Sequence, residues 1–340
     1  YVERCEAMRN FANKIWNASR FVMMNLTIDR YELPAADKLE REDKWVLSKL
    51  NRLVKEVTEN LDSFEIGVAS AKVYDFIWDT YCDWYIELTK TRLNGTDEDA
   101  KLTAQNVLCY VLVTLLKLLH PFMPFITEEI WQALPHSGDY LMLQQWPQHR
   151  AELDFPEEEK AMELIMDAIR GVRARRAEMN VPPSKKAELM IVTDQAEPYQ
   201  QGLHFIQRLA YASNVTFPET APADVTGLVS VVTHDATAYL PLSELVDLAA
   251  ERERIAKELE KAKNGLRITE GKLANEKFVA HAPENVVNAE REKVAKYQEL
   301  IAKLEESAKA MPSSCKVIRR FLYKSPTPFL KVFLLTPNVS

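Results

Sequence analysis

Apolar residues recur at three- and four-residue steps through most of the first 179 residues, and this periodicity constrains the fold more than any other feature. Prolines and an Asn-Gly pair interrupt the pattern and divide it into segments. The segment 98–119 is almost wholly apolar from Val107 onward, so we place it at the centre of a helical bundle. The segments predict helices over residues 1–26, 39–61, 64–92, 98–119, 124–134 and 156–179.

The period changes from 3.6 to 2 after Pro183, which indicates β-strands. Alternating residues predict strands over 187–193, 228–234 and 239–242, with a helix over 199–213 between the first two. Together these elements predict a small α/β unit.

Residues 244–311 carry two heptad seams, which is typical of a coiled coil. A break at residues 281–283 lets the second helix fold back on the first, so we predict an antiparallel hairpin. The seams consist of Ile255, Leu259, Ala262, Leu266, Thr269 and Leu273, and of Val287, Glu290, Val294, Tyr297, Ile301 and Leu304.

The predicted fold is mainly α: a helical-bundle domain, a small α/β domain and a C-terminal antiparallel coiled-coil hairpin. We assign residues 1–155 to the bundle, 156–243 to an α/β junction domain and 244–311 to the coiled-coil arm. Residues 312–340 contain five basic residues and no acid, are broken by prolines and follow no pattern. We interpret this atypical tail as an artefact or a disordered extension, with a basic tail for RNA or a membrane surface as the alternative.

Composition excludes several classes of catalytic site. The chain has 8 glycines, and none form the loops that cradle nucleotide phosphates. Its 4 cysteines lack CxxC spacing, and no two histidines have the spacing of a metal pair. Cys82 and Cys109 lie in apolar helices, so we expect core residues rather than nucleophiles. We therefore predict no catalytic residue, metal or cofactor in this chain, no membrane segment, and a reducing, cytoplasmic location.

The first predicted helix carries a polar stripe beside its apolar one. At about 100° per residue, Arg9 and Arg20 lie only about 20° apart. Arginines, amides and rings together can stack on unpaired bases and read their edges, whereas the net charge of −7 confines any RNA site to a local patch. An ordinary solvated helix face is the alternative interpretation. The candidate residues are Arg9, Asn10, Asn13, Lys14, Trp16, Asn17, Arg20 and Phe21.

Two further basic segments are candidates for contacts with phosphates. For residues 170–186, a row of arginines that pair with neighbouring acidic residues is an equally good interpretation. For the hairpin, the alternative is a solvated coiled coil. The candidates are Arg170, Arg173, Arg176, Lys185 and Lys186 in residues 170–186, and Arg267, Lys272, Lys277 and Arg291 in the hairpin.

Several stretches resemble the C-terminal region of bacterial valyl-tRNA synthetases, which are class I aminoacyl-tRNA synthetases. The first four are similar to the anticodon-binding domain that the valine, isoleucine and leucine enzymes share, and the last is similar to the tip of the coiled coil of the valine enzymes. The stretches are RNFANKIWNASRF (9–21), DKWVLSKLN (43–51), YDFIWDTYCDWYIELTK (74–90), LLHPFMPFITEEIWQAL (118–134), IRGVRARRAEMNVPPSKK (169–186) and KLANEKFVAHAPENVVNAEREK (272–293).

The resemblance implies a region that binds tRNA(Val) through its anticodon and outer corner. Whole enzymes of this family attach valine to tRNA with ATP and Mg²⁺, using catalytic and editing domains. The family's HIGH and KMSKS signatures are absent from this sequence. We expect those domains to be partners in the same chain, and the protein to be a monomer. The same region of an isoleucine or leucine enzyme, or a coiled-coil adaptor that binds protein, are the alternatives.

Overall fold

The structure is a computed structural model that describes residues 2–225, 227–245, 248–274 and 284–310. Its tertiary contacts divide the chain into two units. The first unit comprises Tyr1–Ile169 and Gln195–Ile206, and the second comprises Arg170–Asp194 and Gln207–Ser340. The predicted fold class is confirmed: the chain is mainly helical, with one small sheet. The predicted division into domains at residues 155, 243 and 311 stays a prediction.

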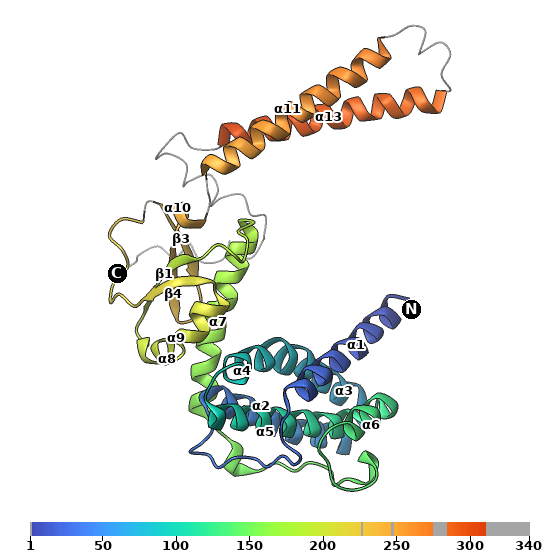
Figure 1. The fold of residues 1–340 in the computed structure, drawn as a ribbon, viewed down its shortest axis with the longest axis vertical. Helices are drawn as coiled ribbons and strands as arrows, with labels where there is room; N and C mark the ends of the chain where they lie inside the picture. Colours follow the sequence, from blue (N-terminus) through green and yellow to red (C-terminus); the bar gives the residue numbers. More distant parts are fainter. Residues whose placement is uncertain (1, 226, 246–247, 275–283, 311–340) are drawn as a thin grey trace, which may run out of the picture. The chain divides into compact units, whose positions relative to one another are not determined.

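The first unit is a helical bundle (Figure 1), and most of its helices lie within two residues of their predicted bounds. Two helix starts have recognisable local causes: Asp97 Oδ1 accepts from the backbone N–H groups of Asp99 and Ala100, and Pro124 occupies the first turn of its helix. The helices are α1 (Val2–Asn25), α2 (Arg41–Asp62), α5 (Glu98–Leu119), α6 (Pro124–Gln132) and α7 (Pro156–Glu178).

Helix α5 occupies the centre of this bundle, as predicted, and packs against α1, α2, α6 and α4 (Ile86–Leu93). Its residues Val107, Leu115 and Leu118 are fully buried. Among the described helices, α5 is also long and apolar enough to cross a membrane, and 78% of its most apolar stretch is buried in the bundle. The buried core helix of a helical bundle can be as long and as apolar as a membrane-spanning helix.

The single helix predicted over residues 64–92 is divided in the structure. It consists of α3 (Ile66–Asp75), a π-helical stretch η1 (Phe76–Tyr85) and α4 (Ile86–Leu93). π-Helical turns widen a helix locally and occur preferentially at functional sites. Two short 3₁₀ helices follow α6, at Leu141–Leu143 and Ala151–Leu153.

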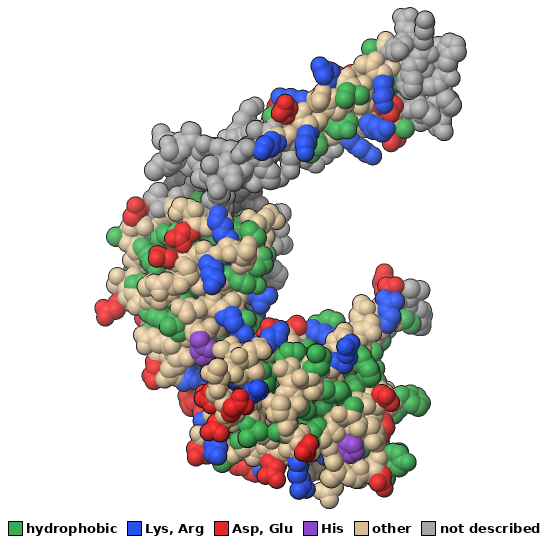
Figure 2. All heavy atoms as spheres, viewed as in Figure 1, with side chains coloured by type: hydrophobic (Ala, Val, Ile, Leu, Met, Phe, Trp, Pro, Cys, Tyr) green, Lys and Arg blue, Asp and Glu red, His purple; other side chains and the backbone are tan. Residues whose placement is uncertain are grey.

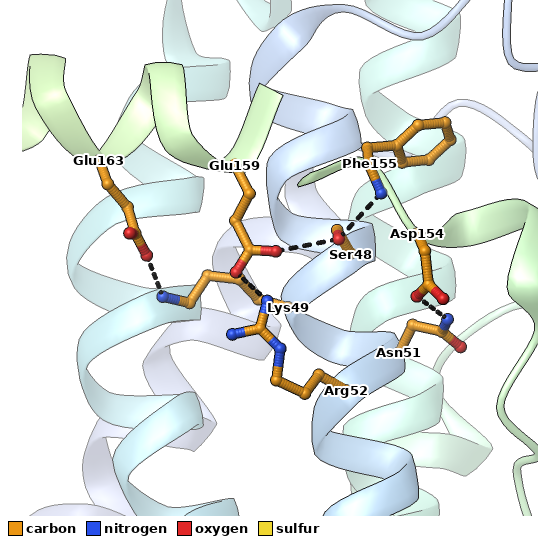
Figure 3. Close-up of polar contacts among 8 residues, drawn as sticks. All are labelled: Ser48, Lys49, Asn51, Arg52, Asp154, Phe155, Glu159 and Glu163. Carbon is orange, nitrogen blue, oxygen red and sulfur yellow. Dashed lines mark hydrogen bonds and ion pairs between the residues drawn. The ribbon is translucent and has the colours of Figure 1, made fainter. Parts of the chain in front are cut away.

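A seam of polar contacts joins α2 to the start of α7 (Figure 3). Glu159 is 6% exposed, accepts from Ser48 Oγ at 3.0 Å and pairs with Arg52. Lys49 Nζ lies 2.9 Å from Glu163 Oε1, and the amide of Asn51 holds the chain just before α7. Because buried polar groups must be paired, this seam fixes the first turns of α7 against α2.

The second unit contains a four-stranded sheet of order β2-β1-β4-β3. Strand β1 pairs in parallel with β2 and antiparallel with β4, and β3 pairs antiparallel with β4. A Cβ at Gly171 would lie 2.9 Å from Val231 Cγ1, so the C-terminal part of α7 packs directly on β3. The strands are β1 (Ala187–Thr193), β2 (Ala212–Thr216), β3 (Leu228–Val232) and β4 (Ala236–Pro241).

The helix predicted over residues 199–213 is confirmed as far as Leu209 and is wrong over its last four residues. The chain forms α8 (Ala196–Gln201) and α9 (Leu203–Leu209), turns at Tyr211 with a φ of 56°, and then enters β2. Pairing with β1 outweighs the local helical pattern there, because an edge of the sheet is free to accept a strand. The short helix α10 (Leu242–Leu245) follows β4.

The arm consists of α11 (Leu248–Leu273) and α13 (Glu284–Ala310), which pack against each other. Ala262 is 3% exposed and packs against Leu259, Tyr297 and Ile301, all of which belong to the predicted heptad seams. The predicted turn at residues 281–283 and the tail 312–340 lie outside the described residues.

Candidate nucleic-acid interface

A hollow of about 490 Å³ lies beside α1 in the first unit. Five of the eight residues proposed on α1 line this hollow, and Ala18 joins them. Residues from η1 and α4 form its other wall, about seventy positions further along the chain. The lining residues are Asn10, Asn13, Lys14, Asn17, Ala18, Phe21, Cys82, Ile86 and Lys90.

Two lysines bring positive charge to this hollow. Lys14 Nζ lies 2.7 Å from Asp83 Oδ1 and 3.8 Å from the centroid of the Trp78 ring. Lys90 Nζ lies 5.6 Å from the centroid of the Phe21 ring and pairs with Glu87. These ion pairs are partly exposed, so each contributes only about 0–1 kcal/mol and can be exchanged for a phosphate.

Amide and aromatic side chains complete the hollow. Asn13 and Asn17 are exposed, and Phe21 is half-buried with one side against the lysine of α4. An amide offers both a donor and an acceptor to a base edge, and a ring offers a stacking surface. The arrangement can therefore hold a planar polar ring next to a phosphate.

Cys82 lies in the wall of the hollow, and its burial raises the pKa of the thiol to about 12. Cys109 lies in the core and has its pKa raised to about 12 for the same reason. Cys109 is buried, as expected of a core residue, whereas Cys82 is only partly buried in the wall of the hollow. No group of three or more His, Cys, Asp or Glu in the described part of the chain could hold a metal.

The remaining candidates on α1 lie on its outer face rather than in the hollow. Arg9 and Arg20 are exposed, and Trp16 is 40% exposed. Arg9 and Arg20 thus flank the hollow on the same helix and are free to reach a sugar–phosphate backbone. The structure therefore divides the predicted stripe into an amide-lined hollow and a cationic outer rim.

A buried charge cluster holds α4 against the start of α2. Arg92 donates to both oxygens of Asp43, at 2.8 and 2.5 Å, and lies 2.9 Å from Glu42 Oε1. Tyr85 OH donates to Asp43 Oδ1 at 2.6 Å. Burial, reinforced by Asp43, raises the pKa of Glu42 to about 7, although the nearby guanidinium opposes the shift. This cluster therefore fixes the last turn of α4, the helix that carries Lys90.

The second candidate patch needs one correction. Arg176 is 3% exposed, donates to the carbonyls of Pro182 and Lys185, and lies 5.5 Å from the Tyr211 ring. Its burial lowers the pKa of the guanidinium. Arg176 therefore closes the turn after α7 and is removed from the surface patch. Sequence reasoning could not detect this, because an arginine row looks the same whether it faces water or the protein.

The other residues of that patch stay at the surface. Arg170, Arg173 and Lys186 are exposed, and Lys185 is half-buried. Their neighbour Arg175 pairs with Glu178 at 2.9 Å, as the alternative interpretation expects.

In the arm, Lys and Arg side chains recur along the described surface, with acidic residues between them (Figure 2). Arg267 and Arg291 are exposed, and Arg267 donates to Asn264 Oδ1 at 3.0 Å. Lys272 lies 3.8 Å from Glu290, whose side chain is almost buried in the seam. Lys277 lies outside the described residues.

Sequence reasoning missed Cys82, Ile86 and Lys90, which form the second wall of the hollow. The four-residue spacing of Ile86 and Lys90 places these two on one face of α4, and this was the signal that could have found them, whereas Cys82 lies in the π-helical stretch, where that spacing gives no signal. What the sequence could not show is that this face meets α1.

Comparison with known protein families gives two matches. The family described as "Anticodon-binding domain of tRNA ligase" matches residues 43–191. The family described as "Valyl tRNA synthetase tRNA binding arm" matches residues 247–311. The first match includes Cys82, Ile86 and Lys90 of the hollow but begins after α1.

The curated relatives that are similar to this chain are named valine–tRNA ligase. A valine–tRNA ligase of Clostridium acetobutylicum is 46% identical over 314 residues, which cover 91% of this chain and 35% of the relative. One from Clostridium perfringens is 47% identical, with 91% and 36% covered, and one from Carboxydothermus hydrogenoformans is 45% identical, with 87% and 34% covered. The chain thus spans about a third of the length of the curated relatives that it matches.

Proposed function

Because the chain belongs to the valine–tRNA ligase family by its anticodon-binding domain and its tRNA binding arm, we propose that it binds tRNA(Val) at two places, the anticodon and the outer corner. The observation that carries this proposal is the hollow beside α1. Asparagines, an aromatic ring and two lysines converge there from elements far apart in the sequence.

An unpaired anticodon base would enter the hollow between α1 and α4. The ring of Phe21 would support its face, at about 1–3 kcal/mol per stacked base. The asparagine amides would read its edge, and Lys14 or Lys90 would exchange its carboxylate partner for the adjoining phosphate. Arg9 and Arg20 on the outer rim would hold the backbone on either side, with Trp16 as a second stacking surface.

The arm would contact the outer corner of the tRNA through shape and phosphates rather than base edges. Arg267 and Arg291 support this role because both are exposed in the described part of the arm. Lys272 contributes less, since it already lies against Glu290. Among residues 170–186, Arg173 and Lys186 are the candidates for further phosphate contacts.

Attachment of valine to tRNA(Val), with ATP and Mg²⁺, is proposed for the whole ligase and is assigned to the catalytic and editing domains of its longer relatives. The residues of this chain offer no glycine-rich phosphate loop and no described metal cluster. A monomeric, cytoplasmic protein without a membrane segment remains part of the proposal.

Titration of the chain with tRNA(Val), at several salt concentrations and with anticodon variants, tests the proposal. Log affinity should fall steeply with log salt, and a changed anticodon should weaken binding. Asn13→Ala and Asn17→Ala should reduce the discrimination between anticodons, because their amides would read the base edge. Lys90→Met should weaken binding to all anticodons alike, because its ammonium group would meet a phosphate. Arg9→Ala and Arg20→Ala should weaken binding to all anticodons alike and lower the salt slope by about 1 each.

Two results would contradict this function. If tRNA(Val) bound no better than a tRNA with another anticodon, the hollow would not read the anticodon. If the chain bound no tRNA at all and instead captured a protein through its arm, the adaptor interpretation would replace it. Glu163→Gln is a matched control, because Glu163 is an exposed residue on α7 outside the hollow.

A further inference from the structure

A second hollow, of about 370 Å³, lies elsewhere in the helical bundle. Helices α2 and α5 form two of its walls with residues at helical spacing, and the irregular segment 145–153 closes another side. Its floor is apolar and buried, with Leu47, Leu50 and Val54 each at most 3% exposed. This volume is at the lower end of the range for small-molecule sites, about 300–1,000 Å³.

The walls of this second hollow are positively charged and aromatic. Tyr31, Tyr110 and Trp146 line it, and no Asp or Glu is found among the described residues of its lining. The indole of Trp146 is held in place, since its Nε1 donates to Thr58 Oγ1 at 2.9 Å. A ligand with a flat ring would therefore find three aromatic side chains in the lining to pack against.

Lys117 supplies a cation that the protein does not neutralise. It lines the second hollow from α5, is half-buried, and has no acidic partner in the described part of the chain. Burial accordingly lowers the pKa of its ammonium group. The other cation of the lining, Arg150, differs because its guanidinium already donates to Glu152 at 2.8 Å.

A half-buried ammonium without a counter-ion is costly, and a bound anion would offset that cost. Tyr110 and Lys117 are seven residues apart on α5, which places their Cα atoms about 10 Å apart along the helix axis, and both side chains line the second hollow. A ligand that satisfies both needs a planar ring at one end and an anionic group at the other. We propose that this second hollow binds a free nucleoside monophosphate, with its base among the tyrosine and tryptophan rings and its phosphate on Lys117.

The site is independent of the proposed tRNA interface, since it shares no lining residue with the hollow beside α1. Calorimetric titration of the full chain with AMP, adenosine and inorganic phosphate tests it. AMP should bind more tightly than adenosine and more tightly than inorganic phosphate. Lys117→Met should weaken AMP binding about 10- to 100-fold, as expected for one charge-assisted contact, and should leave adenosine binding unchanged.

Matched variants assign the binding to this hollow. Tyr31→Leu should weaken both AMP and adenosine, whereas Lys90→Met, in the other hollow, should leave AMP binding unchanged. As a second measurement, AMP should protect Lys117 from an amine-acylating reagent, as followed by peptide mass spectrometry. Protection does not depend on any variant folding correctly.

Several outcomes would overturn the inference. These are no AMP binding at millimolar concentration, equal affinity for AMP and inorganic phosphate, or acylation of Lys117 that AMP does not slow. Loss of tRNA affinity in Lys117→Met, as large as its loss of AMP affinity, would also overturn it, because the hollow would then belong to the tRNA interface. Whichever result is obtained with AMP, the tRNA titration with Lys90→Met tests the proposed function separately, because Lys90 lines only the hollow beside α1.

Discussion

Replacing the buried carboxyl group of Glu42 with an amide should stabilise the bundle at alkaline pH. Glu42 is 5% exposed, and two carboxyl groups share one guanidinium at this site. The ordinary pKa of 4.5 is raised to about 7, mainly by burial. The folded state therefore holds the proton of Glu42 more tightly than the unfolded state does.

The sign and the pH window follow from these two pKa values. Below about pH 4.5 the group is protonated in both states and contributes no pH dependence. Between about pH 4.5 and pH 7 only the unfolded state releases the proton, so the free energy of unfolding decreases as pH rises. Above about pH 7 the loss is constant, at roughly 3 kcal/mol if each pKa unit corresponds to about 1.36 kcal/mol. Glu42→Gln removes this loss and keeps an oxygen that can accept from Arg92.

Urea unfolding at pH 5 and pH 8, followed by tryptophan fluorescence, measures the effect. All 6 tryptophans lie within the helical bundle, between residues 16 and 146, so the signal reports on this unit. At pH 8 Glu42→Gln should be more stable than the parent by about 2–3 kcal/mol, and at pH 5 the two should differ by less than about 1 kcal/mol. Glu163→Gln, at an exposed ion pair, should change stability by no more than about 0.5 kcal/mol at either pH. A Glu42→Gln variant that is less stable than the parent at pH 8 would refute this reasoning.

Three further substitutions test the packing of the fold by the same unfolding assay or by circular dichroism. Asp43→Asn should destabilise the bundle by about 3–5 kcal/mol at both pH values, because it leaves a buried guanidinium without its main partner; a loss below about 1 kcal/mol would contradict the structure. Gly171→Ala should destabilise the second unit by about 1–2 kcal/mol, since its Cβ would lie 2.9 Å from Val231 Cγ1, and unchanged thermal unfolding of that unit would be the contrary result. Gly67→Ala, which meets nothing within 4 Å, should instead stabilise the bundle by about 0.4–1 kcal/mol, and a loss of stability would show that the helix is less open there.

The two walls of the hollow beside α1 differ in how far the sequence could predict them. The polar stripe on α1 follows from helical spacing, so its candidates could be proposed from the order of the residues alone. The opposite wall comes from a helix whose aromatic face predicts only burial, and its π-helical stretch has no signature in residue spacing. Arg176 shows the same limit, because only the packed structure places its guanidinium over Tyr211.

Local periodicity, proline and glycine breaks and heptad spacing by themselves determined the helical bundle, the sheet unit and the two-helix arm. They do so because a helix or strand must bury whatever apolar face its own repeat creates. Only the tertiary structure decided which faces meet: that η1 packs against α1 beside the hollow, that residues 212–216 join the sheet as β2 rather than continue a helix, and that Lys117 faces a hollow with no acid in its described lining. Those outcomes depend on contacts between residues far apart in the chain, and no local repeat specifies them.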